Sequence, residues 1–424
     1  MALTERGASR RNIVLISTDN VSFWIGMAFL GPTTVLPNLI RLLGGSPLAV
    51  GVLGAINSGG WMLPQFLAGR FIANRPLVQR RVIVPAYASR LCLALAAVSL
   101  LLLAPRAPSL AVAAILLGFL GFTVGDALSG IGWVELMSKV VPLPMRGRVL
   151  GAGQSLSSFF SIGAGVLVEA ILARPQPFAQ NHALLLGLAS AFTLIGTTGI
   201  ALIREPRAPV ESGPILPWGE YLRRLGMILR HDQRFARFMA VRCLAGLADM
   251  AAAFYVLFAV SRLHIREDAV GLFISAGVVG GLLCGVLLGT LGDRRGAGAV
   301  VRVVMILRCT CPALALLAPL AAGWGPLPLL GLFLLIFALA GMVNGAFMVG
   351  FTNYLLEIAP ASERSLYIAL ANTLLGLLIA APVLAGWLVQ AAGYEPLFAL
   401  SLGVAVLGAA LAWLGLEARP AHAG

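Results

Sequence analysis

Long apolar runs separated by short polar loops fill the chain from residue 12 to residue 416. Each run is long enough to cross a bilayer, because roughly 20 apolar residues in an α-helix span the hydrocarbon core. The runs are continuously apolar, so they lack the alternating pattern of membrane β-barrel strands. The sequence therefore predicts twelve transmembrane helices, at residues 12–40, 47–73, 81–104, 109–139, 147–173, 182–203, 236–263, 269–292, 299–322, 327–357, 364–391 and 395–416.

The longest polar stretch lies near the middle of the chain, and its first part contains four prolines. Proline interrupts helices, which makes this stretch a linker. Its second part, Trp218–Arg237, is basic and amphipathic, and suits either the anionic inner leaflet or a plain connection. We expect an N-terminal six-helix bundle at 1–203, a cytoplasmic linker at 204–235 and a C-terminal six-helix bundle at 236–424.

Composition supports the membrane interpretation. Hydrophobic residues make up 59% of the 424 residues and charged residues 11%, whereas a soluble domain carries about 25% charged residues. The net charge of +13 would suggest nucleic acid as the partner of a soluble protein. Here the basic residues lie in short loops between apolar runs, and no separate basic domain exists, so nucleic acid is excluded as a partner.

The positions of the basic residues also predict the orientation. Of the 30 Lys and Arg residues, 22 fall in the segments that face the cytoplasm if the N-terminus does, and 5 fall in the opposite loops. Cytoplasmic loops of membrane proteins carry the excess of Lys and Arg. We expect a multi-pass protein of the cell's inner or plasma membrane, a monomer with both termini in the cytoplasm. We also expect the first helix to be retained, because no small-residue cleavage site follows it.

The two halves of the chain repeat each other. Arg90 in the third predicted span aligns with Arg308 in the ninth, at an offset of 218 residues. The loop Val141–Arg146 aligns with Ala359–Arg364 at the same offset, and both carry proline and arginine at matching positions. Parallel repeats of six helices are one of the architectures of transporters.

A loop after the eighth span carries the pattern Gly289-x-x-x-Asp293-Arg294-Arg295-Gly296. It resembles the Gly-x-x-x-Asp-Arg-x-Gly motif of the major facilitator superfamily, and its first-half counterpart has Ala73 in place of the aspartate. Together with the twelve-span repeat, this makes the chain similar to that family over essentially its whole length. The resemblance implies two pseudo-symmetric bundles, alternating access, and a central cavity lined by spans one, four, seven and ten.

Charged residues inside a membrane cost roughly 2.5–3.5 kcal/mol each on insertion scales, and so mark bundle interiors or water-filled cavities. The resemblance implies that those on spans one, four, seven and ten handle substrate or protons. The charged candidates are Asp19, Asp126, Arg242 and Asp249, and the uncharged Asn344, which aligns with Asp126 at an offset of 218 residues, is added to them. The alternative is that they are buried ion pairs or hydrogen-bonded acids that only pack helices. Three further charges, Arg90, Arg308 and Glu135, are expected to be structural.

One acid is expected to exchange a proton with the solvent. Asp126 has no basic residue near it on its own helix, and its nearest candidate partner is Arg90 on span three. If Arg90 turns to Glu135 instead, Asp126 is left without a partner and becomes the first choice for the proton site. Asp249 is the second choice and Asp19 the third. In the alternative, all three are fixed in hydrogen bonds and transport is uncoupled.

The loop motif also predicts a cytoplasmic latch that forms in one access state. Asp293 is expected to face the first turn of span eleven, where unpaired backbone N–H groups favour an anion. Arg294 or Arg295 is expected to reach Glu357 at the end of span ten. The residues of the predicted latch are Gly289, Asp293, Arg294, Arg295, Glu357 and Arg364.

Other function classes find little support in the sequence. No phosphate-binding GxxxxGK[ST] loop is present, so ATP is not expected to drive transport. None of the four histidines lies in the middle of a span, which argues against an enzyme, and we expect no catalytic residue, metal site or cofactor. The leading hypothesis is proton-coupled export of a small hydrophobic or amphipathic solute. The alternatives are uptake or facilitated transport of a small metabolite, or a membrane sensor or scaffold that does not transport.

Overall fold

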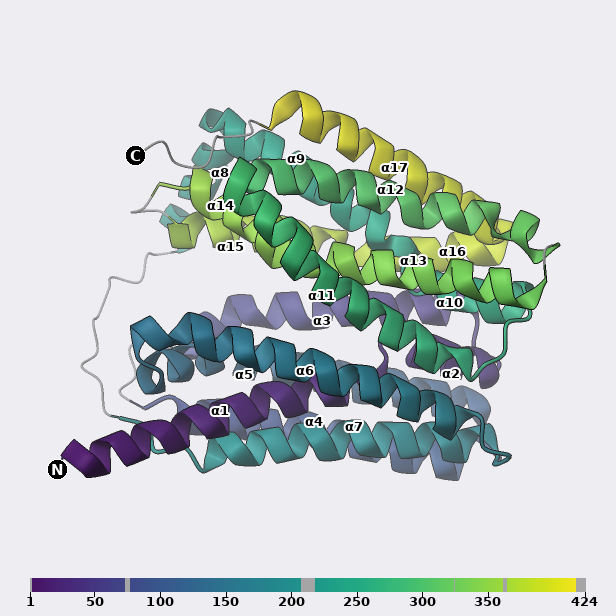
Figure 1. Ribbon diagram of the computed structural model, residues 1–424, viewed down its shortest axis with the longest axis horizontal. Helices are drawn as coiled ribbons and strands as arrows, with labels where there is room; N and C mark the ends of the chain where they lie inside the picture. The colour runs from purple at the N-terminus through teal and green to yellow at the C-terminus, as the bar shows by residue number, and fades with distance from the viewer. Residues whose placement is uncertain (1, 73–76, 207–217, 324, 361–363, 417–424) are drawn as a thin grey trace. The chain divides into compact units, whose positions relative to one another are not determined.

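The computed structural model of the chain describes residues 2–72, 77–206, 218–323, 325–360 and 364–416. Every regular element in those residues is a helix, and long helices follow one another through short loops (Figure 1). A helix bonds its own backbone N–H and C=O groups, for which lipid offers no other partners. The predicted all-α membrane class is confirmed.

The chain divides into two compact units. The first contains Met1–Gly213 and Glu267–Gly271, and the second contains Pro214–Arg266 and Leu272–Gly424. The helices of the first unit are α1 (Ala2–Leu30), α2 (Val35–Leu42), α3 (Pro47–Ile72), α4 (Gln79–Leu103), α5 (Pro108–Val140), α6 (Leu143–Leu172) and α7 (Phe178–Ala201). Within this unit α4 packs against α5 and α7, α1 packs against α6 and α7, and α3 packs against α5.

The second unit contains more and shorter helices. Its α-helices are α8 (Trp218–His231), α9 (Gln233–Ala248), α10 (Phe254–Leu257), α11 (Ala269–Arg295, whose first residues are grouped with the first unit), α12 (Ala297–Ala322), α13 (Pro326–Ala346), α14 (Asn353–Ile358), α15 (Arg364–Gly376), α16 (Ala381–Ala392) and α17 (Tyr394–Gly415). Four helical segments of other types connect some of them: the 3-10 segments η1 (Asp249–Ala251) and η4 (Leu377–Ala380), and the π segments η2 (Phe258–Arg262) and η3 (Phe347–Thr352). Within the unit α12 packs against α13 and α17, and α17 packs against α9.

Eleven helical spans in the described residues are long and apolar enough to cross a membrane. They coincide with the predicted spans one and three to twelve. The predicted second span corresponds to α3, which is 26 residues long and has side chains that are described only in its first part. The first span, Arg10–Leu42, joins α1 and α2 through Gly31. Gly31 has a φ of +49°, which a residue with a side chain adopts only under strain.

Three spans of the second unit are not continuous α-helices. The seventh changes from α to 3-10 geometry at Asp249 and to π geometry at Phe258, and the tenth contains the π segment η3. The eleventh changes to 3-10 geometry at η4. Breaks of this kind leave some backbone groups without their usual partners, and π segments occur often at functional sites.

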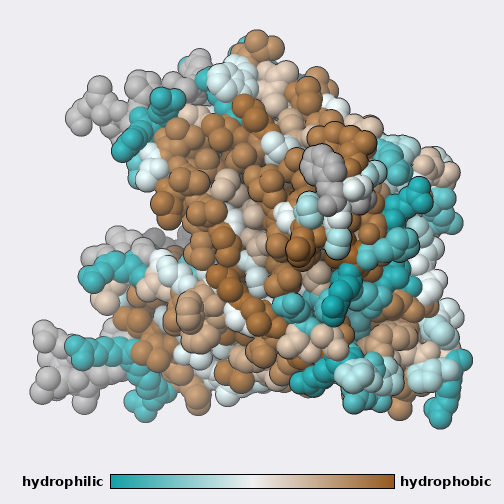
Figure 2. All heavy atoms as spheres, turned by 45° about the vertical axis from the view of Figure 1, so that its right-hand side comes forward, coloured by the Kyte–Doolittle hydropathy of each residue, from teal (hydrophilic) through white to brown (hydrophobic). Residues whose placement is uncertain are grey.

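Apolar side chains cover much of the surface. In the face drawn in Figure 2, hydrophobic residues form broad continuous areas, and hydrophilic residues gather toward the margins. Many large apolar side chains on the outer faces of the helices are more than half exposed, among them Leu117, Phe159, Leu320 and Leu414. A soluble protein rarely exposes apolar patches of this size, whereas lipid solvates them.

Candidate functional site

Asp19 is a buried acid in the first third of the first span, Arg10–Leu42. Its side chain lies on α1, the residue is 7% exposed, and Oδ2 accepts a hydrogen bond of 2.7 Å from Nε1 of Trp133 on α5. Gly196 on α7 allows this helix to approach, because a Cβ atom there would lie 2.8 Å from Oδ1 of Asp19. In the described part of the chain, Asp19 has no ion pair with a basic side chain.

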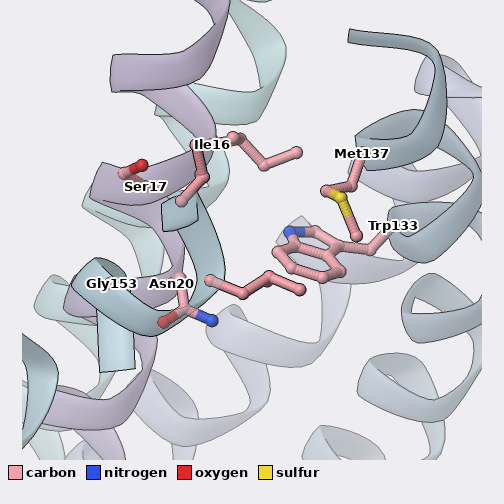
Figure 3. A pocket seen from close by; sticks show the side chains of 8 residues that line it. Ile16, Ser17, Asn20, Trp133, Met137 and Gly153 are labelled. Atoms are coloured by element: carbon pink, nitrogen blue, oxygen red, sulfur yellow. The ribbon is translucent and has the colours of Figure 1, made fainter. Parts of the chain in front are cut away.

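A small pocket opens beside this acid. It is shallow, with room for about one water molecule, and lies among α1, α5 and α6. Figure 3 shows Trp133 and Met137 on one side of it and Ile16 and Asn20 on the other. Ser157 on α6 donates a hydrogen bond of 3.3 Å to Oδ1 of Asn20. The pocket is thus mainly apolar, with an amide group in its wall and the Asp19–Trp133 pair at its edge.

Arg90 and Asp126 form an ion pair inside the first unit. Nη2 of Arg90 lies 2.9 Å from Oδ1 of Asp126, and the two side chains are 5% and 15% exposed. The guanidinium also lies over the rings of Phe23 and Phe122, at 5.5 and 5.3 Å from their centroids. Such contacts favour a desolvated cation.

This pair changes the expected order of proton sites. The order depended on Arg90 turning to Glu135, but Glu135 pairs with Lys139 at 3.3 Å and Arg90 pairs with Asp126. The reason is geometric: Asp126 lies about two turns deeper in the span than Glu135, at the level of Arg90. Asp126 is therefore not the acid that lacks a cationic partner.

Arg308 and Asp249 form the corresponding pair of the second unit. Nε and Nη2 of Arg308 donate to the two carboxylate oxygens at 2.9 and 2.7 Å, which is the two-point geometry of a strong pair. Asp249 is the first residue of η1, and its side chain is 42% exposed. The end of α9 is also fixed by Ser401, whose hydroxyl donates to the carbonyl of Ala248 at 2.7 Å.

Arg242 is a buried cation of a different kind. It is 4% exposed, and its Nε and Nη1 atoms have no hydrogen-bond partner. Its guanidinium lies 5.0 Å from the ring centroid of Phe347 at the start of η3. Asn344, one turn earlier on α13, is exposed. The sequence placed Arg242 and Asn344 on cavity-lining spans, and Phe347 is a neighbour that it did not single out.

The residues of the expected latch lie at the ends of helices in the second unit. Gly289 lies two turns from the end of α11, and Asp293, Arg294 and Arg295 are exposed in its last turn. Glu357 accepts a hydrogen bond of 3.3 Å from the backbone N–H of Ala297, the first residue of α12. The side chain of Arg364 and the first-half residue Ala73 lie outside the described residues.

Glu205 was missed by the sequence analysis, which included it in the linker. Its side chain is 2% exposed and accepts hydrogen bonds from the backbone N–H groups of Val78 and Gln79, at the start of α4. It also pairs with Lys139 at 3.0 Å. A negative charge at a helix N-terminus is favourable. An acid directly after span six, among basic residues, was the signal that could have identified it.

The described residues contain no group of three His, Cys, Asp or Glu side chains that could hold a metal ion. The first unit contains a buried acid, Asp19, that is bonded to an indole N–H, and the second contains a buried cation, Arg242, two of whose nitrogens have no hydrogen-bond partner.

Comparison with known proteins shows which family and which folds the chain resembles. The model of the Major Facilitator Superfamily matches residues 238–424. The nucleoside transporter NupG has 14% sequence identity and a TM-score of 0.66, over 96% of this chain and 98% of that chain. A bacterial homologue of the iron transporter ferroportin, in its inward-facing state, has 15% identity and a TM-score of 0.68 over the same shares. The D-xylose-proton symporter has 15% identity and a TM-score of 0.67, again over 96% and 98%. No functionally curated protein matches the sequence.

The family match in the second half, and a fold shared over nearly the whole length with solved transporters, make the chain similar to the major facilitator superfamily. The resemblance inferred from the sequence is confirmed.

Proposed function

We propose that this protein is a secondary transporter that works by alternating access, and that it exports a small amphipathic solute across the cell's inner or plasma membrane in exchange for protons. The observation that carries the proposal is the environment of Asp19. A buried carboxylate has to be neutralised by a cation or by a proton. Asp126 and Asp249 have arginine partners, whereas Asp19 has a single neutral donor, the indole of Trp133.

The pocket at Trp133 would form one part of a larger site for an amphipathic solute. Ile16, Met137 and the ring of Trp133 offer apolar contact, and the amide of Asn20 offers hydrogen bonds. Small-molecule sites commonly combine a mainly apolar wall with a few polar groups. A proton that binds Asp19 removes a charge at the edge of this pocket, so solute binding and proton binding would influence each other there.

The latch belongs to the same proposal. Asp293, Arg294 and Arg295 are exposed at the end of α11 and free to change partners. Glu357 touches the start of α12, which keeps an acid close to the loop that joins α11 and α12. We propose that these residues hold the cytoplasmic side closed in one access state.

The test begins with a transport screen in cells that lack their main exporters. A panel of toxic amphipathic compounds should include some whose toxicity the chain relieves. One of these is then measured in proteoliposomes with an imposed pH gradient. The parent protein should concentrate the compound, while Asp19→Asn, which keeps an oxygen for Trp133, should lose gradient-driven transport and retain counterflow exchange.

The control is Glu169→Gln. Glu169 is a half-buried acid near the C-terminal end of α6, and the variant should concentrate the compound as the parent does. If Asp19→Asn concentrates the compound as the parent does, Asp19 is not the coupling site. If the parent itself ignores the pH gradient, transport is uncoupled facilitation. Accumulation in the opposite direction would indicate uptake.

A further inference from the structure

The second unit contains a buried positive charge that nothing in the described chain neutralises. Arg242 is 4% exposed, and two of its three guanidinium nitrogens are enclosed without a hydrogen-bond partner. Arginine stays protonated inside proteins. Buried charges are normally paired, because an isolated one loses its hydration without compensation. The ring of Phe347 compensates for part of this loss but carries no net charge.

The nearest acid along the same span is already engaged. Asp249 lies seven residues after Arg242, about 10 Å along the helix, and both of its oxygens accept from Arg308. The three charges deep in the spans of this unit are therefore one neutral pair and one surplus cation. A ligand with one negative charge would balance this surplus positive charge.

The surroundings of Arg242 are open. Phe347 is 39% exposed and Asn344 is exposed, and both lie within the span Pro326–Ile358. An exposed amide at this depth would be unfavourable against lipid, so this face meets water or a solute. The chain also changes to π geometry at Phe347, as helices often do at functional sites.

We propose that Arg242, together with Phe347 and Asn344, binds the anionic head of the transported solute, which carries one negative charge, as a carboxylate does. The guanidinium offers two parallel N–H groups that match the two oxygens of a carboxylate. The exposed ring of Phe347 provides an apolar face for the body of the solute, and the amide of Asn344 provides a hydrogen bond. This inference rests on the proposed transport function and specifies the class of its substrate.

Binding of benzoate, as a simple aromatic carboxylate, tests the assignment on the purified full-length chain in detergent. A ligand that binds only the folded state raises the unfolding temperature with concentration. Benzoate should do so and benzamide, its neutral analogue, should not. Arg242→Gln should weaken benzoate binding by about tenfold to a hundredfold, the usual range for a charged hydrogen bond. Arg262→Gln, an exposed arginine at the end of the same span, should leave binding unchanged.

The stability of the ligand-free variants separates binding from a structural role. Removing an uncompensated charge should leave the unfolding temperature unchanged or raise it, so Arg242→Gln should be at least as stable as the parent. Arg308→Gln should lower it, because Asp249 then loses its partner. A destabilised Arg242→Gln, an equal response to benzamide, or unchanged benzoate binding by Arg242→Gln would each overturn the proposal. Tighter binding of phenyl phosphate than of benzoate would overturn the single-charge assignment.

This experiment needs no gradient and no translocation. A failure of proton coupling at Asp19 therefore leaves its result unaffected, and a failure to bind benzoate leaves the coupling measurement unaffected.

Discussion

Two arginines at equivalent positions of the repeat form ion pairs with acids of different spans. Arg90 pairs with Asp126 on the fourth span, whereas Arg308 pairs with Asp249 on the seventh. The position that corresponds to Asp126 in the second half is Asn344, which has no charge to offer. In the second unit Arg308 instead takes the acid of the seventh span, and Arg242 on that same span has two nitrogens without a hydrogen-bond partner. The repeated arginine thus has a different partner in each half.

The first prediction concerns the Arg90–Asp126 pair. Asp126→Asn leaves the guanidinium of Arg90 buried without a counter-charge, and breaking a buried pair in this way costs about 3–5 kcal/mol. The variant should unfold at a clearly lower temperature or denaturant concentration in detergent, as followed by tryptophan fluorescence. The control is Glu135→Gln on the same helix. The side chain of Glu135 is 35% exposed, so this substitution should lower the free energy of unfolding by less than about 1 kcal/mol. Equal stability of the two variants would contradict a structural role for the pair.

The candidate site could be predicted from the sequence only in part. Charges in apolar runs are visible without a structure, and so Asp19, Asp126, Asp249 and Arg242 were all recognised. Their partners were not, because the choice of Arg90 between two acids depends on the depth and rotation of neighbouring helices. Glu205 was missed because its role comes from the start of α4, 126 residues earlier in the chain.

At the scale of helices, hydropathy locates the spans but not the breaks inside them. The seventh and tenth spans read as uninterrupted apolar runs, yet both change helical geometry in their interior. A hydropathy average depends on side chains, whereas a change from α to π geometry is a change in backbone hydrogen bonds. That Asp249 and Phe347 begin two of these segments is therefore visible only in the structure.

The second prediction concerns the crossing of α11 and α13. A Cβ atom on Gly280 would collide with the backbone carbonyl of Ala338, and one on Gly341 with that of Gly277. Because backbone cannot move aside as a side chain does, Gly280→Ala should force the helices apart and cost about 1–3 kcal/mol. Gly285→Ala, five residues later on the same helix and without a neighbour within 4 Å, should be neutral or stabilising by up to about 1 kcal/mol. Thermal unfolding of both variants in detergent distinguishes them, and equal shifts would refute the close crossing.

At the scale of the whole molecule, the fold was the most predictable level. Lipid allows a long apolar chain few solutions, and continuous runs of 20 or more residues select helices among them. Direction of transport is not predictable in the same way. The direction depends on the relative free energies of two access states and on the driving ion. The pattern of apolar residues predicts neither of these.

The last prediction is the orientation in the membrane. Hydrogen bonds of Glu205 bring the start of α4, the end of α5 at Lys139 and the segment after α7 to one end of the first unit. The loops that adjoin these helix ends therefore share one side of the membrane, and they are among the segments that hold 22 of the 30 basic residues. The positive-inside rule assigns that side to the cytoplasm. A reporter enzyme that is active only outside the cytoplasm should give no signal at the C-terminus and a strong signal when fused near Arg106 or Arg266. The opposite pattern of signals, with the fusions expressed at equal levels, would reverse the orientation and move the expected latch to the outer face.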